Sequence, residues 1–402
     1  MKKTLLDYFL KYVKIDTMSA EGKDTVPSTL KQFDLAKVLV KDLEDLGLKD
    51  IKLSDHCFVT AVLPTNCDSK LHIGFIAHMD TIPGFSGTNV KPQVVENYDG
   101  KTIKLKGIEL NPAEFPFLNG MKGKTLITTD GTTVLGADDK AGDANIMTML
   151  NYYVNNPTVP HVNIHVAFTP DEEIGGGIDY MDIEGFGCDF AYTVDGGIPY
   201  EINYENFNAA RAIVNVKGLD FHPGDAKNKM INAALVAMEF NSLLPVNERP
   251  EFTEGYDGFN HLISMEGVCG EAKLDYILRN HSLDILNRQK QDFYNAKDFI
   301  NKKYNRDLVE VDIKDSYYNM ATLINEDPTC VIRAKKAIEA VGLTPVTSPI
   351  RGGTDGAKLT LKGLKTPNLG TGGYNYHGPY ELACLEEMEQ VVKILIEIAK
   401  EA

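Results

Sequence analysis

Residues 71–80 read Leu-His-Ile-Gly-Phe-Ile-Ala-His-Met-Asp, an almost apolar run that ends in His and Asp. Such a run is typical of a strand that is covered on both faces of a sheet. Further strand-like runs occur at 162–168 and 189–194, and helical patterns occur at 28–47 and at about 141–154. Strands that alternate with helices predict an α/β domain with a mostly parallel sheet.

A different pattern begins near residue 207. It predicts strands and helices in the order β-α-β-β-α-β, at residues 208–217, 228–243, 261–268, 272–279, 283–303 and 308–315. We therefore expect a smaller α+β domain over 207–318, inserted into a larger domain made of 1–206 and 319–402. The larger domain then resumes with elements at 328–341, 346–350, 366–371 and 384–401.

The charge balance limits the partners of the chain. Its 402 residues include 57 acidic and 41 basic side chains, which gives a net charge of −16. This argues against nucleic acid and against a membrane surface, because both are bound through basic residues. No apolar run approaches a membrane span, and the first residues favour an amphipathic helix over an export signal. The six scattered cysteines are interpreted as reduced thiols of a cytoplasmic protein.

Five motifs put acids and histidines at or just beyond the ends of predicted strands. Each has an ordinary interpretation when taken alone: a polar strand end, a helix cap or a solvated loop. Asp138-Asp139, for example, is read equally well as a cap or as a pair of ligands. The residues of the five motifs are His78 with Asp80, Asp138 with Asp139, Asp171-Glu172-Glu173, Asp195 and His377.

The motifs gain weight as a set. Ligands of open α/β sheets bind at the carboxyl edge of the strands, where all five motifs lie. Two histidines and several carboxylates, without thiolates, suit Zn²⁺. Their number is enough for two ions that share one bridging carboxylate. In the run of three acids, one Glu would bind a metal and its neighbour would act as a general base.

The chain resembles the M20 metallopeptidase family over essentially its whole length. Long stretches carry this resemblance in addition to the short motifs, and they are similar to the tripeptide aminopeptidases of that family. They are Gln93–Tyr98, Thr125–Gly131, Asn206–Ala210, Asp315–Met320 and Ile350–Ala357. The resemblance implies a zinc-peptidase-like catalytic domain with an inserted lid domain, and release of the N-terminal residue from tripeptides.

The resemblance also implies a role for each residue of the metal site. His78 and Asp195 would bind the first metal, and Glu173 and His377 the second. Asp138 would bridge the two ions, with a cis peptide bond to Asp139. Asp80 would orient His78, and Glu172 would be the general base. Two Zn²⁺ per subunit are expected, and other divalent metals stay open.

The inserted domain, with His222 and Arg279, and the larger domain, with Arg351, would both add substrate contacts. His222 matches the lid histidine that lies near the tetrahedral intermediate. Arg351 and Arg279 are candidates for binding the terminal carboxylate of a short peptide, because Arg pairs with carboxylates bidentately. Arg279 is interpreted equally well as a surface residue.

Other activities of the family stay open, because a dipeptidase, a carboxypeptidase or an amide deacylase would share the metal site. A non-catalytic peptide-binding protein would not need Glu172. A homodimer also stays open, since an exposed strand edge of the lid could pair two subunits.

Overall fold

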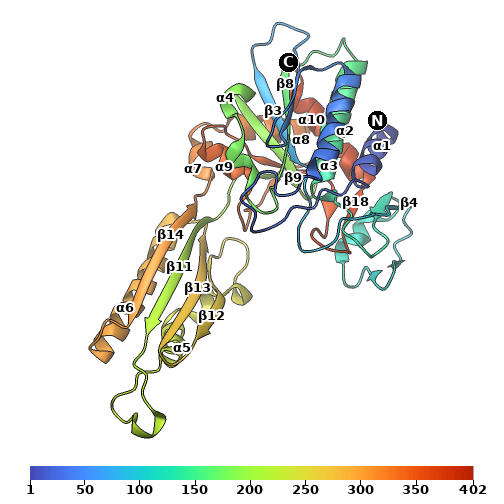
Figure 1. Ribbon diagram of the computed structural model, residues 1–402. Helices are drawn as coiled ribbons and strands as arrows, with labels where there is room; N and C mark the ends of the chain where they lie inside the picture. Colours follow the sequence, from blue (N-terminus) through green and yellow to red (C-terminus); the bar gives the residue numbers. More distant parts are fainter. Residues whose placement is uncertain (402) are drawn as a thin grey trace. The chain divides into compact units, whose positions relative to one another are not determined.

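The computed structural model describes residues 1–401, and they form two compact units. The first consists of Met1–Tyr204, Thr322–Ser348 and the chain from Thr354 onward. The second consists of Glu205–Ala321 together with the short segment Pro349–Gly353. The second unit is therefore an insertion into the first (Figure 1).

The first unit is built on an eight-stranded sheet with the order β1-β2-β8-β3-β9-β16-β10-β15. Strands β8, β3, β9 and β16 run parallel to one another, whereas β2 pairs with β8, and β10 pairs with β16, in the antiparallel direction. The strands are β1 (Lys49–Leu53), β2 (Val59–Leu63), β3 (His72–His78), β8 (Asn163–Thr169), β9 (Phe190–Gly196), β10 (Glu201–Asn203), β15 (Val346–Thr347) and β16 (Asn368–Gly370). The predicted mostly parallel α/β fold is confirmed.

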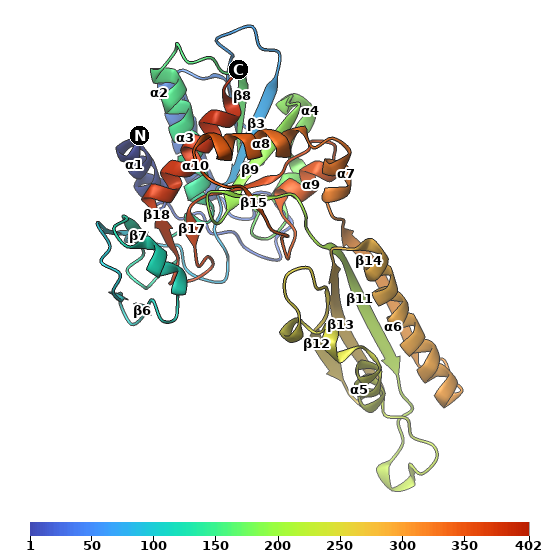
Figure 2. The same ribbon diagram turned by 180° about the vertical axis from the view of Figure 1, so that it is seen from behind.

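Helices cover both faces of this sheet, which explains the apolar run in β3. On one face α3 packs against β3, and α1 and α10 pack against α3 (Figures 1 and 2). On the other face, side chains near α4 and α9 form a buried cluster with Ile76, Ala167 and Ala191. The helices are α1 (Lys2–Tyr12), α2 (Gln32–Leu46), α3 (Ala137–Asn155), α4 (Ile183–Phe186), α7 (Ala321–Glu326), α8 (Thr329–Ala340), α9 (Asp355–Leu361) and α10 (Leu385–Ala399).

A smaller sheet lies beside α3, in the order β17-β18-β7-β4. Its strands are β4 (Gln93–Val95), β7 (Leu126–Thr128), β17 (Gly373–Tyr374) and β18 (Leu382–Cys384), and β5 (Ile103–Lys104) pairs separately with β6 (Glu109–Leu110). An aromatic cluster supports it: Phe117 stacks on Tyr374, with ring centroids 4.9 Å apart. Phe115 lies 5.3 Å from Tyr380 in the same cluster. Tyr374 and Tyr380 flank the segment that carries His377 in the sequence.

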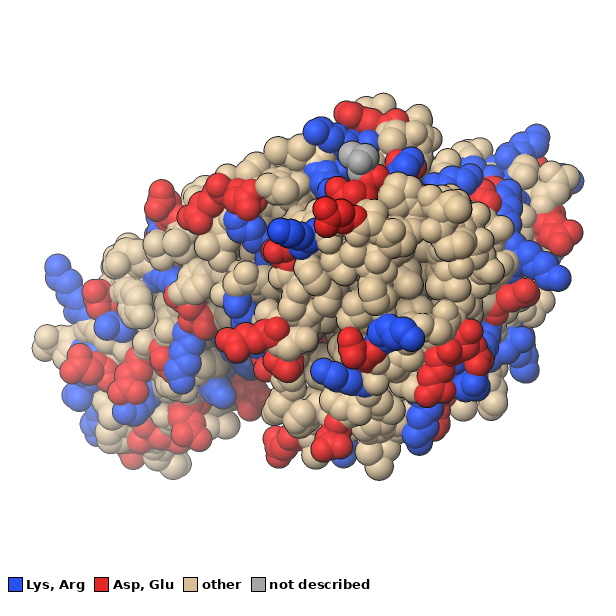
Figure 3. All heavy atoms as spheres, turned by 90° about the horizontal axis from the view of Figure 1, so that it is seen from above, with Lys and Arg blue, Asp and Glu red and all other residues tan. Residues whose placement is uncertain are grey.

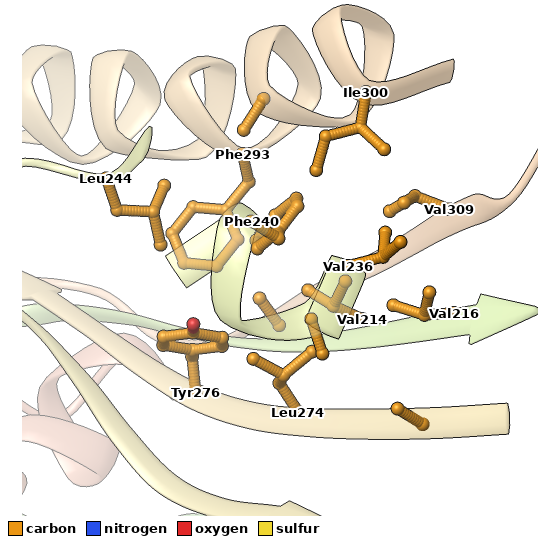
Figure 4. Close-up of a cluster of buried hydrophobic side chains, with 14 of the residues drawn as sticks. Val214, Val216, Val236, Phe240, Leu244, Leu274, Tyr276, Phe293, Ile300 and Val309 are labelled. Carbon is orange, nitrogen blue, oxygen red and sulfur yellow. The ribbon is translucent and has the colours of Figure 1, made fainter. Parts of the chain in front are cut away.

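The second unit is an antiparallel sheet with two helices. The sheet order is β12-β13-β11-β14, and the chain order is β11, α5, β12, β13, α6, β14. Phe240, Tyr276 and Phe293 are buried between the sheet and the helices, within the core drawn in Figure 4. The elements are β11 (Asn208–Lys217), α5 (Ala233–Leu243), β12 (Phe259–Gly267), β13 (Glu271–Asn280), α6 (Leu283–Tyr304) and β14 (Val309–Tyr317).

Some predicted boundaries differ from the structure for local reasons. The helix expected from residue 28 begins at Gln32, because Ser28 binds the carboxylate of Asp171 instead of entering a helix. The helix expected from residue 228 begins at Ala233, where the Asn232 side chain caps the backbone N–H groups of residues 234 and 235. The strand expected over 346–350 ends at Thr347, and Ile350 bridges to Asn206 in the second unit.

Among residues 1–401, no helix has the combined length and hydropathy of a membrane span. Acidic and basic side chains are interspersed over the face shown in Figure 3.

Candidate active site

Six of the predicted site residues meet at the carboxyl edge of the large sheet. His78 ends β3, Glu172 and Glu173 follow β8, and Asp195 is the penultimate residue of β9. Asp138 lies in the first turn of α3, and His377 follows β17. Strands adjacent in a parallel sheet end at one edge, so His78 and Asp195, 117 positions apart in sequence, converge there with the two glutamates. Asp138 and His377 join them from the start of α3 and from the turn after β17.

Asp138 stands between the two histidines. One of its carboxylate oxygens lies 2.9 Å from Nε2 of His78, and the other lies 3.1 Å from Nε2 of His377. Asp195 is 3.5 Å from the same nitrogen of His78, and Glu173 is 3.0 Å from Nε2 of His377. The arrangement is therefore two histidine–carboxylate groups that share one carboxylate.

The donor atoms of this cluster fit divalent cations. Two groups of three residues each place their ligand atoms within 4.8 Å of one another: His78 with Glu172 and Asp195, and His78 with Asp138 and Glu173. In addition, Oε1 of Glu173 is buried and has no hydrogen-bond partner. Imidazole nitrogens and carboxylate oxygens are ligands that zinc accepts, and an unpartnered buried carboxylate oxygen is costly without a cation.

The electrostatics of the cluster show the cost of gathering these acids. Burial and the neighbouring Asp195 raise the pKa of Glu172 well above its usual value. Burial also raises the pKa of Asp195 to about 7, against the lowering effect of His78. Hydrogen bonds to Asp138 and Glu173 raise the pKa of His377 to about 10. The site therefore favours added positive charge, either protons or metal ions.

Asp80 contacts both His78 and the loop after β8. Its Oδ1 lies 3.4 Å from Nδ1 of His78, and its backbone oxygen lies 3.1 Å from the same nitrogen. The backbone N–H groups of Glu172 and Glu173 donate to its two carboxylate oxygens at 2.9 and 3.3 Å. Asp80 is fully buried, so it fixes the ring of His78 and the start of the Glu172-Glu173 segment together.

The adjacent acids Asp138 and Asp139 face in different directions. Asp138 faces the histidines, whereas Asp139 accepts hydrogen bonds from the backbone N–H groups of His78 and Gly142, both at 3.2 Å. The peptide bond between the two acids is cis, as the resemblance implies. The sequence left a cap and a ligand as equal alternatives, and the structure assigns cap geometry to Asp139 and a place in the cluster to Asp138.

Two buried acids near the site have roles that the sequence reasoning did not assign: Asp171 was named only as part of a motif, and Glu381 was missed. Asp171 accepts hydrogen bonds from Ser28 and Gln32, which ties the segment before Glu172 to the start of α2. Glu381 accepts hydrogen bonds from the turn that leads to Asp138. Their partners lie more than 100 residues away in sequence, so no local pattern indicates them.

The other three predicted residues belong to the second unit. His222 is exposed and its Nδ1 accepts a hydrogen bond from the backbone of Gly224 at 3.1 Å. Arg279 donates to backbone oxygens of its own sheet and lies over the ring of Tyr317. Arg351 donates to the backbone oxygens of residues 255 and 257 at 2.7 and 2.8 Å.

A family model described as peptidase family M20/M25/M40 matches residues 135–401. The chain belongs to this peptidase family, and the predicted hydrolase class is confirmed. It is 50% identical over 402 residues to Peptidase T of Alkaliphilus oremlandii, with 98% of each chain covered. Crystal structures of aminopeptidase PepT from Bacillus cereus and of a tripeptidase from Staphylococcus aureus have the same fold. Their TM-scores are 0.80 and 0.79 at 22% and 21% identity, with 99% and 100% of this chain and 98% of each of theirs covered.

Proposed function

We propose that the protein is a tripeptide aminopeptidase that uses two metal ions. The observation that carries this proposal is the cluster in which Asp138 lies between two histidine–carboxylate groups. The tripeptide specificity is supported by the full-length similarity to Peptidase T. In this proposal the substrates are short peptides with a free amino terminus.

His78 and Asp195 would hold one ion, Glu173 and His377 the other, and Asp138 would lie between them. We propose zinc, because the donors are imidazoles and carboxylates without thiolates, and other divalent ions share these preferences in part. When bound, the ions supply an activated water and polarise the scissile carbonyl.

Glu172 has the chemistry of the general base. Its carboxylate reaches the same group of ligand atoms as His78 and Asp195, and burial favours its protonated form. It would take a proton from the attacking water and return it to the leaving amine. Asp80 would keep both His78 and the Glu172 backbone in place during these transfers.

In the second unit, His222 is proposed to stabilise the tetrahedral intermediate, and Arg279 and Arg351 to bind the substrate carboxylate. Arg351 would have to exchange its two backbone acceptors for that carboxylate. Arg279 is more restricted, since its guanidinium both donates to the sheet backbone and covers Tyr317. The six cysteines are unpaired in the structure, which supports a reducing compartment such as the cytoplasm.

Digestion of a set of peptides by the purified protein tests this function. The set is a free-amine tripeptide, its N-acetylated form, and the matching dipeptide and tetrapeptide, each used after chelation and again after zinc is restored. We expect zinc-dependent release of the first residue from the free tripeptide alone. Cleavage of the dipeptide or of the acetylated peptide instead would assign a dipeptidase, carboxypeptidase or deacylase activity. Absence of cleavage by metal-loaded protein would favour a peptide-binding role.

A further inference from the structure

Glu381 is a buried acid whose carboxylate is surrounded by backbone donors. It is 1% exposed and lies directly before β18. One oxygen accepts hydrogen bonds from the backbone N–H groups of Leu135 and Gly136, at 2.7 and 2.8 Å. The other accepts from the backbone N–H of Asp138 at 3.0 Å. Both oxygens are thus used, and all three donors lie in one turn.

These bonds connect the two chain segments that carry Asp138 and His377. The donors belong to the turn at 135–138, where Gly136 has the left-handed φ of +78°. The acceptor belongs to the turn after His377, closed by a hydrogen bond from the Glu381 backbone N–H to the Gly378 oxygen at 3.3 Å. The side chains of Asp138 and His377 meet 3.1 Å apart between these segments.

The physical reason for an acid at this position is the set of unpaired donors. The first N–H groups of a helix have no intrahelical acceptor, and the donor Asp138 lies in the first turn of α3, which the donors Leu135 and Gly136 directly precede. A charged acceptor makes stronger hydrogen bonds than a neutral one. A buried carboxylate is nevertheless costly, and it adds one more acid to a site that already gathers several. If the residue only capped the N-terminus of α3, a neutral Asn or Ser would serve equally well.

We propose that Glu381 is a positioning residue for the second metal. By tying the 135–138 turn to the 377–381 turn, it fixes the separation of Asp138 and His377 and so preforms that half of the metal site. The inference rests on the proposed two-metal function. It assigns Glu381 no contact with the metal or the substrate, because its carboxylate oxygens are taken by peptide nitrogens.

The variant Glu381→Gln tests this role with almost no change of shape. In either orientation of the amide, its NH₂ group faces a backbone N–H of the turn, so at least one of the three hydrogen bonds is lost. Zn²⁺ titration of the metal-free protein, followed by calorimetry, measures two binding steps. We expect one step to weaken by about 10- to 100-fold, the usual effect of removing a partner that orients a ligand. Far-ultraviolet circular dichroism should stay unchanged.

Glu386→Gln is the matched control. Glu386 also accepts a backbone hydrogen bond, from Thr125 at 2.7 Å, but it lies on α10 and contacts no residue of the cluster. The Glu386→Gln protein should bind both zinc ions with wild-type affinity. Equal Zn²⁺ affinities for Glu381→Gln and Glu386→Gln would overturn the proposal. The variant Glu381→Asp retains the charge but shortens the reach, and we expect it to bind zinc as weakly as Glu381→Gln; wild-type affinity here would show that charge alone matters and would also overturn it.

A measurement on the wild type covers the case in which the variants fail to fold. If the turn is preformed, the amide hydrogens of residues 135, 136 and 138 exchange slowly with solvent in the metal-free protein. Fast exchange that becomes slow only with Zn²⁺ would contradict preformation. Failure of the proposed function looks different: the wild type would bind two ions, with Glu381 behaving as described, and would leave every peptide intact.

Discussion

The variants Glu172→Gln and Glu173→Gln should differ in whether added zinc restores their activity. Both backbone N–H groups are held by Asp80, at 2.9 and 3.3 Å, so a Gln at either position leaves the chain in place. The side chains differ in their surroundings. Glu173 contacts His377 at 3.0 Å and has a buried oxygen with no partner, which is the environment of a ligand. Glu172 is assigned to proton transfer.

Glu172→Gln should lower kcat by about 10²- to 10⁴-fold, the usual contribution of a general base. This corresponds to about 2.7–5.4 kcal/mol of transition-state stabilisation at 1.36 kcal/mol for each factor of ten. Zinc content and KM should change little, because a neutral amide still fits beside His78. Glu173→Gln should instead weaken one metal step by at least about 10- to 100-fold, and excess zinc should restore much of its kcat.

The assay is tripeptide hydrolysis at increasing free zinc, with the bound metal measured in parallel. The reasoning would be refuted by a reversal: activity of Glu172→Gln that recovers with zinc, or activity of Glu173→Gln that stays low while two ions are bound. Either result would exchange the roles of the two residues. The matched control is Glu184→Gln, an acid in the first turn of α4, for which we expect wild-type kinetics.

Three further perturbations follow from the structure. Removal of metal should make stability depend on pH: burial raises the pKa of Asp195 to about 7, so its stabilising contribution, present below about pH 4, is lost as the pH rises through 7. Melting curves of chelated and zinc-loaded protein should therefore diverge as the pH rises, and parallel curves would contradict this. Gly142→Ala should cost about 1–3 kcal/mol in urea unfolding, because the new Cβ would lie 2.1 Å from the Val194 backbone oxygen; an unchanged midpoint would show that α3 can shift. Phe293→Ala, in the fully buried core of the second unit, should cost about 3–5 kcal/mol of unfolding free energy, and a loss below 1 kcal/mol would show that this core is loosely packed.

The fold was predictable because its signals are local. The apolar run of β3 and the alternation of apolar and polar residues in β11 indicate directly which side chains of each strand are buried. Boundaries were less accurate where a distant partner decides them. Ser28 fits a helix start by composition, but the Asp171 carboxylate, 143 positions away, binds its backbone N–H and hydroxyl and holds it outside α2. No window of sequence around residue 28 contains that acid.

The residues of the candidate site also differ in how far the sequence predicts them. The residues that cluster at the carboxyl edge of the large sheet could be predicted because such an edge gathers whatever follows each parallel strand, as it does for His78 and Asp195. Glu381 follows no strand of the large sheet, and its carboxylate binds the backbone N–H groups of another turn. Almost every residue type has a backbone N–H group, so the sequence does not indicate which residues will bind such an acid. Sequence reasoning can therefore name the side chains that gather at such an edge, while those that hold the backbone behind them become visible only in three dimensions.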